Sequence, residues 1–394
     1  MLRVLHSIHF PVSARSFVKP VVDYLNQSGI ATELWVENHS KHSTVIQQLN
    51  VPKRLVASDL VFNPIEFIRR LSNYRRQLRV ANPDILHTHQ TRASLIPLLA
   101  AYLEKIPIRV YQNHGLPYLG YRGPLRWLLR SLEIINIRLA THVLLVSRSN
   151  LSAARKDRLL SANQGAVIAN GSAVGIDLAE YELSSFSGHR KKQAKKKFGV
   201  AEAPFVLAYV GRPVRRKGFH LLLKAWEKSG LGLQNCFLLI AGCTANECEA
   251  ALGHPVVGVK GLGYLTNLSK FYAACDAVTL PSEHEGFPYS LLEGAAAAKP
   301  LIGTDIPGIR CAIQPNQTGL LVPVNDELAL ANAISQLASD PVLRSRLGQN
   351  ARKRVEQEFA REIVLTSLQD FYYKDLGCCP QAEPILRMGH LSHL

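Results

Sequence analysis

Two short segments in the second half of the chain concentrate the residue types that bind anions and hydroxyl groups. The first, GRPVRRKG, follows an apolar run expected to be a strand and precedes an expected helix. Its Arg212 offers a planar guanidinium and its Lys217 a point charge, both near a helix N-terminus, where free backbone amides also attract anions. This arrangement suits a diphosphate. A solvated basic turn is the alternative interpretation.

The second segment, PSEHEGFPYSLLEG, follows the apolar run AVTL. Its spacing predicts Glu285 in the loop and Glu293 inside the next helix, so that both carboxylates can face one cleft and accept hydrogen bonds from sugar hydroxyls. The backbone of Gly286, Phe287 and Pro288 precedes the helix N-terminus and can meet an anion there. A capping acid together with a structural Glu is the alternative for these two carboxylates.

The elements that must position these segments form two similar series of strands and helices. Short apolar runs predict strands at residues 2–8, 31–36, 85–89, 108–113, 142–147 and 166–169, and then at 205–210, 236–241, 277–280 and 301–303. Helical periodicity predicts helices at 18–27 and 94–104, and then at 218–228, 290–298, 328–337 and 341–359. Alternation of this kind predicts an α/β fold with two doubly wound, Rossmann-like halves and a cleft between the carboxyl ends of their sheets.

The chain length and composition fit this organisation. Its 394 residues are 47% hydrophobic and 19% charged, which excludes large-scale disorder, collagen and a disulfide scaffold. We expect one domain at 1–185 and a second at 186–360. A C-terminal helix at 361–377 is expected to pack back toward the first domain, and residues 378–394, which lack periodicity, are expected to form a loose tail.

The formal net charge of +16 is concentrated in residues 1–185, which carry +10 of it. An excess of this size indicates an anionic partner: nucleic acid, a membrane surface or a phosphorylated small molecule. The chain has neither zinc-ligand spacing nor an RNA-binding signature, so nucleic acid is the least favoured of the three. The seven cysteines form no CxxC pair, which favours a reducing cytoplasm. The segment MLRVLHSIHF does not resemble a signal peptide, and the apolar runs are too short to span a bilayer.

Several motifs together resemble a known enzyme family. EGFPYSLLEG resembles the E-x7-E motif of retaining glycosyltransferases of family 4, which have the two-domain GT-B fold, and GRPVRRKG resembles the phosphate-binding motif of that family. PSEHEGFP, TDIPGIR and TGLLVP follow the family pattern in order and spacing, and the resemblance covers residues 1–371. It implies that Arg212 and Lys217 hold the donor diphosphate and that Glu293 holds the nucleotide ribose. Glu285 then contacts the donor sugar as a catalytic residue, assisted by backbone amides around Phe287.

The first half carries weaker likenesses to the same family. PDILHTH resembles a strand that ends in a histidine pair, and its His89 is expected on the acceptor side of the site. YQNHG resembles the strand that presents a catalytic histidine, here His114, to the donor sugar. A structural hydrogen-bond donor is the alternative for His114. The loop PVSARS replaces the usual glycine pair, so Ser13 and Ser16 are expected to supply the acceptor-loop amides. Cys311 stands where the family often has Glu.

The run HGLPYLGYRGPLRWLLRSLE favours the capsular and O-antigen branch, whose members extend sugars on polyprenyl-diphosphate carriers. The resemblance therefore implies retaining transfer of a hexose or N-acetylhexosamine from a nucleotide sugar, expected to be a UDP-sugar, to a lipid-linked saccharide. No Asp-x-Asp motif occurs, so neither a metal nor another cofactor is expected. The alternatives are a non-catalytic sugar-nucleotide-binding partner subunit, a transferase with a soluble acceptor, and another GT-B enzyme such as an epimerase, against which the E-x7-E loop argues.

Two basic segments could bind a membrane. Residues 65–80 place Phe67, Leu71, Tyr74 and Leu78 on one helical stripe among arginines, and residues 118–138 add Trp127 and its neighbours. Basic amphipathic helices lie on anionic bilayers, whereas an ordinary surface helix packs such a stripe on its own sheet. With the resemblance, this pattern predicts a cytoplasmic protein peripheral to the inner face of the cytoplasmic membrane.

Overall fold

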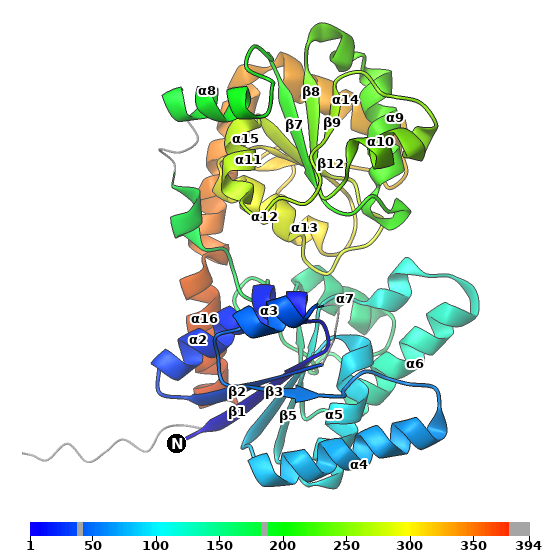
Figure 1. Cartoon of the computed structure of the whole chain (residues 1–394), viewed down its shortest axis with the longest axis vertical. Coiled ribbons are helices and arrows are strands. Elements are labelled where there is room, and N and C mark those ends of the chain that lie inside the picture. The colour runs from blue at the N-terminus through cyan, green and yellow to red at the C-terminus, as the bar shows by residue number, and fades with distance from the viewer. Residues whose placement is uncertain (38–41, 183–187, 378–394) are drawn as a thin grey trace, which may run out of the picture.

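Two six-stranded parallel sheets, one above the other along the long axis, form the framework of the molecule (Figure 1). The computed structural model describes residues 1–37, 42–182 and 188–377. Each sheet, with its strands numbered in chain order, has the arrangement 3-2-1-4-5-6 of a doubly wound domain. The predicted α/β class with two Rossmann-like sheets is confirmed.

In the first domain the strands, in spatial order, are β3 (Lys53–Val56), β2 (Ala31–Glu37), β1 (Arg3–Ile8), β4 (Ile85–His89), β5 (Ile108–Asn113) and β6 (His142–Leu145). The helices are α1 (Pro11–Ser13), α2 (Lys19–Gln27), α3 (Ser43–Gln48), α4 (Pro64–Ala81), α5 (Thr91–Leu103), α6 (Gly123–Leu139) and α7 (Arg148–Lys156), with a π-helical turn at Ala14–Val18. The central strand β4 is buried at every position, as expected for a parallel sheet covered on both faces.

In the second domain the strands, in spatial order, are β12 (Gly319–Val322), β11 (Leu301–Thr304), β10 (Ala277–Leu280), β7 (Val206–Val210), β8 (Phe237–Ala241) and β9 (Val259–Gly261). The helices are α8 (Gly188–Lys197), α9 (Phe219–Ser229), α10 (Ala245–Leu252), α11 (Leu268–Ala274), α12 (Tyr289–Ala296), α13 (Ile309–Ala312), α14 (Glu327–Ser339) and α15 (Pro341–Arg354). Strands β10 and β11 are likewise buried throughout.

The sequence patterns failed at the sheet edges. Residues 166–169 do not form the predicted strand, because only Ala166 pairs there, in a single bridge with Leu144. The structure adds β3, β9 and β12. β3 and β9 lack a run of strongly apolar residues, whereas β12, with the sequence GLLV, is as apolar as the predicted strands and was missed. Edge strands are short and carry charges such as Lys53 and Lys260, so their patterns resemble loops.

The C-terminal segment crosses back to the first domain, where α16 (Arg361–Asp370) and a π-helical turn at Phe371–Asp375 pack beside α2 (Figure 1). Leu365, Leu368 and Tyr372 share a buried apolar cluster with strands of the first sheet. Next to this crossing, the amide of Ile176 donates to the carbonyl of Phe359, 2.8 Å away, so two chain crossings lie side by side. The predicted boundary at 185 and the predicted tail at 378–394 lie outside the described residues.

The stripe proposed for membrane contact on α4 instead packs inward. Tyr74 and Leu78 are fully buried, and Phe67 and Leu71 pack against the core behind β1 and β4. The membrane interpretation of that stripe is wrong, because helical periodicity shows that one face is apolar but not what covers it. Among the described residues, no helix has the length and hydropathy needed to cross a bilayer.

Candidate active site

A cavity of about 560 Å³ lies between the two domains. The first domain contributes His9, Asp59, Arg92 and His114 to its wall, together with apolar residues of the segment that leads into α6. The second contributes Arg216, His284, Glu285 and Gly286. All of these second-domain residues come from the two loops that sequence analysis singled out for their chemistry.

Glu285 is the best-anchored acidic group of the cavity. It lies in the loop between β10 and α12 and is 8% exposed. Its Oε1 accepts hydrogen bonds from Lys217 Nζ at 2.6 Å and from Ser282 Oγ at 2.7 Å. Lys217 is brought there because its own loop packs on the Glu285 loop: a Cβ atom on Gly218, at φ 69°, would lie 1.9 Å from the carbonyl oxygen of Pro281. The structure thus joins the two segments as one charged unit.

The backbones of the two domains touch at His114 and Gly286. A Cβ atom on Gly286 would lie 1.8 Å from the carbonyl oxygen of His114, and a Cβ atom on Gly115, at φ 127°, would lie 2.7 Å from the Gly286 Cα. Asn150 Nδ2 donates to the Gly286 carbonyl at 2.7 Å, and the His284 imidazole donates to the carbonyl of Leu116, also at 2.7 Å. Only glycine backbones allow His114 and Glu285 to come this close.

The N-terminus of α12 lies beside this contact. Pro288 occupies the N-cap position and provides no side-chain cap, so the first amides of the helix have no capping side chain. The Phe287 side chain is buried, with its ring 5.4 Å from that of Phe359, so only its backbone can serve a ligand. The Tyr289 hydroxyl accepts from the amide of Ala173 at 2.7 Å and so ties this loop to the interdomain crossing.

Glu293 lies one turn into α12 and does not line the cavity described above. Its Oε2 accepts from the Tyr272 hydroxyl at 3.1 Å, and burial raises its pKa to about 7. Arg212 is exposed on the loop after β7. Ser13 is partly buried and Ser16 exposed, both on the turn after β1, and neither belongs to the cavity wall. The structure therefore brings Glu285, Lys217, Gly286 and His114 together. The cavity wall does not include Glu293, Arg212, Ser13 or Ser16.

His89 stands directly behind His114. It is 2% exposed, and its Nδ1 lies 3.1 Å from His114 Nε2. Its other ring nitrogen, Nε2, lies 2.9 Å from Nδ1 of the fully buried His6. His89 therefore supports His114 from within the domain and takes no part in the cavity wall.

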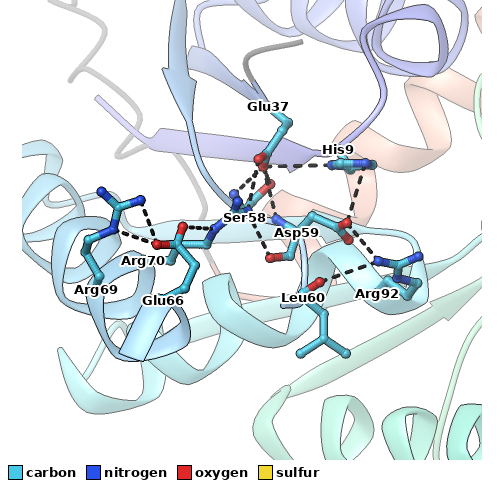
Figure 2. Close-up of polar contacts among 9 residues, drawn as sticks. All are labelled: His9, Glu37, Ser58, Asp59, Leu60, Glu66, Arg69, Arg70 and Arg92. Carbon is cyan, nitrogen blue, oxygen red and sulfur yellow. Dashed lines mark hydrogen bonds and ion pairs between the residues drawn. The ribbon is translucent and has the colours of Figure 1, made fainter. Parts of the chain in front are cut away.

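Sequence reasoning missed an ionic network on the first-domain side of the cavity (Figure 2). Glu37, at the end of β2, accepts from the Asp59 amide at 3.0 Å, from the Ser58 amide and from Arg70 Nη1 at 3.2 Å. Burial alone would raise the pKa of Glu37, but hydrogen bonds from His9 and these amides lower it overall. Asp59 is thereby held at the cavity wall, with Arg92 Nη2 2.9 Å from its Oδ2.

A second missed cluster lies under the loop that carries His114. The fully buried Glu133 of α6 accepts from the Tyr111 hydroxyl at 2.7 Å and from Asn113 Nδ2 at 3.0 Å. Asn113 Oδ1 in turn accepts from the amide of Gly115 at 2.8 Å. Burial raises the pKa of Glu133 to about 7. No local sequence signal marks this cluster, because the carboxylate lies on α6 and the groups that donate to it lie on β5.

Cys311 lies between the domains. Its thiol donates to Ser149 Oγ at 3.2 Å, and that oxygen accepts from the amide of Gly308 at 2.7 Å. The cysteine that departs from the family pattern thus makes an interdomain contact at the N-terminus of α7.

Two doubly wound domains whose strand ends face a shared cavity, with Glu285 in its wall and Lys217 bonded to that carboxylate, define the GT-B class of glycosyltransferase. Residues 14–173 match the family model described as Glycosyltransferase Family 4, and residues 190–354 match that described as Glycosyl transferases group 1. Together the matches cover most of the chain, which belongs to the GT-B glycosyltransferases with a family 4 and a group 1 domain.

Curated relatives and solved structures agree with this assignment. The capsular polysaccharide biosynthesis glycosyltransferase CapM of Staphylococcus aureus is 28% identical over 74% of this chain and 76% of its own length. The N,N'-diacetylbacillosaminyl-diphospho-undecaprenol alpha-1,3-N-acetylgalactosaminyltransferase of Campylobacter jejuni is 28% identical over 73% and 77%. The crystal structure of Anabaena HepE with UDP and glucose superimposes with a TM-score of 0.78 at 16% identity, covering 95% of this chain and 100% of that one.

Proposed function

We propose that this glycosyltransferase moves a hexose or N-acetylhexosamine from a UDP-sugar to a lipid-linked saccharide in the synthesis of a capsule or O-antigen, with retention of the α configuration. The observation that carries the proposal is the interdomain cavity, which has Glu285, bonded to Lys217 behind it, on one side and Asp59 on the other. The names of the similar proteins support it. The relative from Campylobacter and a galactosyltransferase of Escherichia coli, 24% identical over 78% of this chain, are both named for diphosphoundecaprenol-linked acceptors.

The donor is proposed to bind against the second domain. Its diphosphate lies between Lys217, Arg212 and the open N-terminus of α12, where the backbone of Gly286, Phe287 and Pro288 lies. Two cationic side chains and a helix N-terminus supply the charge that stabilises a departing diphosphate, so the proposal requires no metal or other cofactor. Glu293 accepts hydrogen bonds from the ribose hydroxyls, and Glu285 and His114 contact the donor sugar.

The transfer step is proposed to take place on one face of the sugar. The acceptor hydroxyl oxygen forms a bond to the anomeric carbon on the face from which the diphosphate leaves, and the bond between that carbon and the phosphate oxygen breaks. The departing phosphate oxygen receives the acceptor proton. Glu285 is already hydrogen-bonded to Lys217 and Ser282, so its role in this step is to position and stabilise charge.

The acceptor is proposed to enter from the first domain, with its carrier lipid in an anionic bilayer at the inner face of the cytoplasmic membrane. On α6, Trp127 is 67% exposed, and Leu125 and Leu128 are exposed beside Arg122. Leu125 also belongs to the cavity wall, so the apolar surface of α6 runs from solvent to the cavity. An amphipathic basic helix in this position suits a surface that delivers a lipid diphosphate.

A radiolabel assay tests the proposal. A panel of sugar nucleotides is offered with an undecaprenyl-diphosphate-linked saccharide or with soluble sugars and hydroxy acids. We expect lipid-linked product, with the α anomer seen by NMR, and its loss in Lys217→Ala and Glu285→Ala but not in the exposed control Lys228→Ala. An inverted product refutes retention, and product with soluble acceptors alone refutes the lipid acceptor. The absence of any transfer or donor hydrolysis supports the non-catalytic partner alternative.

A further inference from the structure

A continuous buried chain of side chains connects the C-terminal segment to His114. The Tyr372 hydroxyl lies 2.5 Å from His87 Nδ1 and 3.4 Å from His6 Nε2. His6 Nδ1 lies 2.9 Å from His89 Nε2, and His89 Nδ1 lies 3.1 Å from His114 Nε2. Tyr372, His6 and His87 are all 0% exposed, so water does not reach the contacts among these three, whereas His114 at the other end lies in the cavity wall.

The imidazoles of this chain are neutral at neutral pH. Burial lowers the pKa of His6 to about 3 and that of His114 to about 4. Burial and then the neighbouring imidazoles hold the pKa values of His87 and His89 well below the ordinary value. A neutral imidazole has one N–H donor and one lone-pair acceptor. Each ring that donates on one side must therefore accept on the other.

Only two proton arrangements satisfy every contact between Tyr372 and His114. If the Tyr372 hydroxyl donates to His6, then His6 donates to His89, His89 donates to His114, and the proton of His114 lies on Nδ1. If the hydroxyl donates to His87 instead, it accepts from His6, the donors reverse along the chain, and His114 carries its proton on Nε2. The orientation of one hydroxyl group is thus linked to the tautomer that His114 presents in the cavity wall.

Three buried histidines could also suggest a metal site, since the ligand atoms of His6, His87 and His89 lie within 4.8 Å of one another. The ring geometry argues against this. The His87 and His89 rings are 4.6 Å apart and inclined by only 9°, so they lie face to face. A metal must lie near the plane of each ligating imidazole, and it cannot lie near two stacked planes at once. Both His6 nitrogens also already have hydrogen-bond partners, which are the Tyr372 hydroxyl and His89.

We propose that Tyr372 is a positioning residue for His114: its hydroxyl keeps one of the two orientations, and through His6 and His89 that orientation sets a single tautomer of His114. The benefit for catalysis rests on the proposed contact between His114 and the donor sugar, since only one tautomer has the donor or acceptor that a given sugar oxygen needs. The C-terminal segment that returns to the first domain thereby contributes to the cavity without reaching it.

The test compares two hydroxyl deletions in the same interface. Tyr372→Phe keeps the ring in its apolar cluster and removes the hydroxyl. Tyr24→Phe is the matched control. The Tyr24 hydroxyl contacts Thr366 and Gln369 of the same C-terminal segment but has no part in the series of hydrogen bonds from Tyr372 to His114. Nitrogen-15 NMR of histidine-labelled protein without ligands reads the tautomer of His114 directly. We expect one tautomer in the parent protein and in Tyr24→Phe, and a mixture in Tyr372→Phe.

Kinetics provide the second readout, with hydrolysis of the sugar nucleotide that the donor panel identifies. We expect kcat to fall about fivefold to tenfold in Tyr372→Phe with little change in KM, the size expected for one hydrogen bond. In a His89→Leu background the same substitution should change kcat less than about twofold, because the hydrogen bonds that connect His6 to His114 are already lost.

Three results would overturn the proposal. They are a mixture of His114 tautomers in the parent protein, the same His114 tautomer and the same kcat in Tyr372→Phe and Tyr24→Phe, or a stoichiometric metal that resists chelation. The NMR result does not depend on turnover. A protein with no transfer activity but a Tyr372-dependent tautomer would refute the proposed function and leave this inference intact.

Discussion

The contact between Gly286 and His114 predicts that a single methyl group separates the two halves of the active site. In Gly286→Ala the new Cβ atom would lie 1.8 Å from the carbonyl oxygen of His114, whereas real Cβ contacts below 3.0 Å are essentially never seen. The two backbones must therefore move apart by about 1 Å or more. A misplacement of about 1 Å between reacting groups costs about 100-fold in rate. We expect kcat to fall by about this factor, measured as sugar transfer at saturating donor.

A matched control separates this effect from ordinary glycine strain. Gly253→Ala replaces a glycine whose backbone, unlike that of Gly286, is left-handed, at φ 79°, and whose added Cβ atom would meet nothing within 4 Å. It should lower the free energy of unfolding by about 1 kcal/mol and leave kcat unchanged. If Gly286→Ala keeps more than a third of the parent kcat, or if Gly253→Ala loses as much activity, the closed contact has no part in catalysis.

Three further predictions follow from charge, burial and exposure. Lys217→Ala should weaken UDP binding by about tenfold or more in calorimetry, as expected for a lost charge-assisted hydrogen bond, and unchanged affinity would remove this residue from the diphosphate site. Glu133 has a pKa of about 7 in the folded protein against an ordinary value of 4.5, so its contribution to stability is complete below pH 4.5 and is lost as pH rises toward 7. Between pH 4.5 and 7.5 the free energy of unfolding of Glu133→Gln, measured with urea, should therefore rise by up to about 3 kcal/mol relative to that of the parent protein. A difference in unfolding free energy that does not change with pH would contradict the raised pKa of Glu133. Trp127→Ser should reduce sedimentation with anionic vesicles about tenfold, whereas Leu233→Ser, at an 82% exposed position in the second domain, should not.

The two motif loops could be placed from the sequence because each depends on local order along the chain. An apolar run predicts a strand, the strand must end, and the loop after it lies at the carboxyl edge of a parallel sheet. Glu285 and Lys217 follow such runs, and the structure joins them at 2.6 Å. The same logic could not find Asp59, which follows the short edge strand β3 and is held by Glu37 from another strand.

The amphipathic segments show a different limit. The periodicity of α4 and α6 predicted helices with an apolar stripe, and both helices form. Periodicity does not state whether sheet, solvent or lipid covers the stripe, and on α4 Tyr74 and Leu78 are buried in the core. On α6 Leu129 and Leu132 are buried, while Trp127 remains exposed. Only the packing of the whole domain distinguishes these cases.

The sequence by itself determined the α/β class, the pairing of two similar halves and the loops that carry the charged residues, because these features follow from patterns within about ten neighbouring residues. The tertiary structure alone decided the contacts made across long separations. Tyr372 meets His6 across 366 positions of the chain, and Gly286 meets the His114 carbonyl from the other domain. No local periodicity encodes such contacts, since they arise only when the C-terminal segment returns to the first sheet and the two domains close on each other.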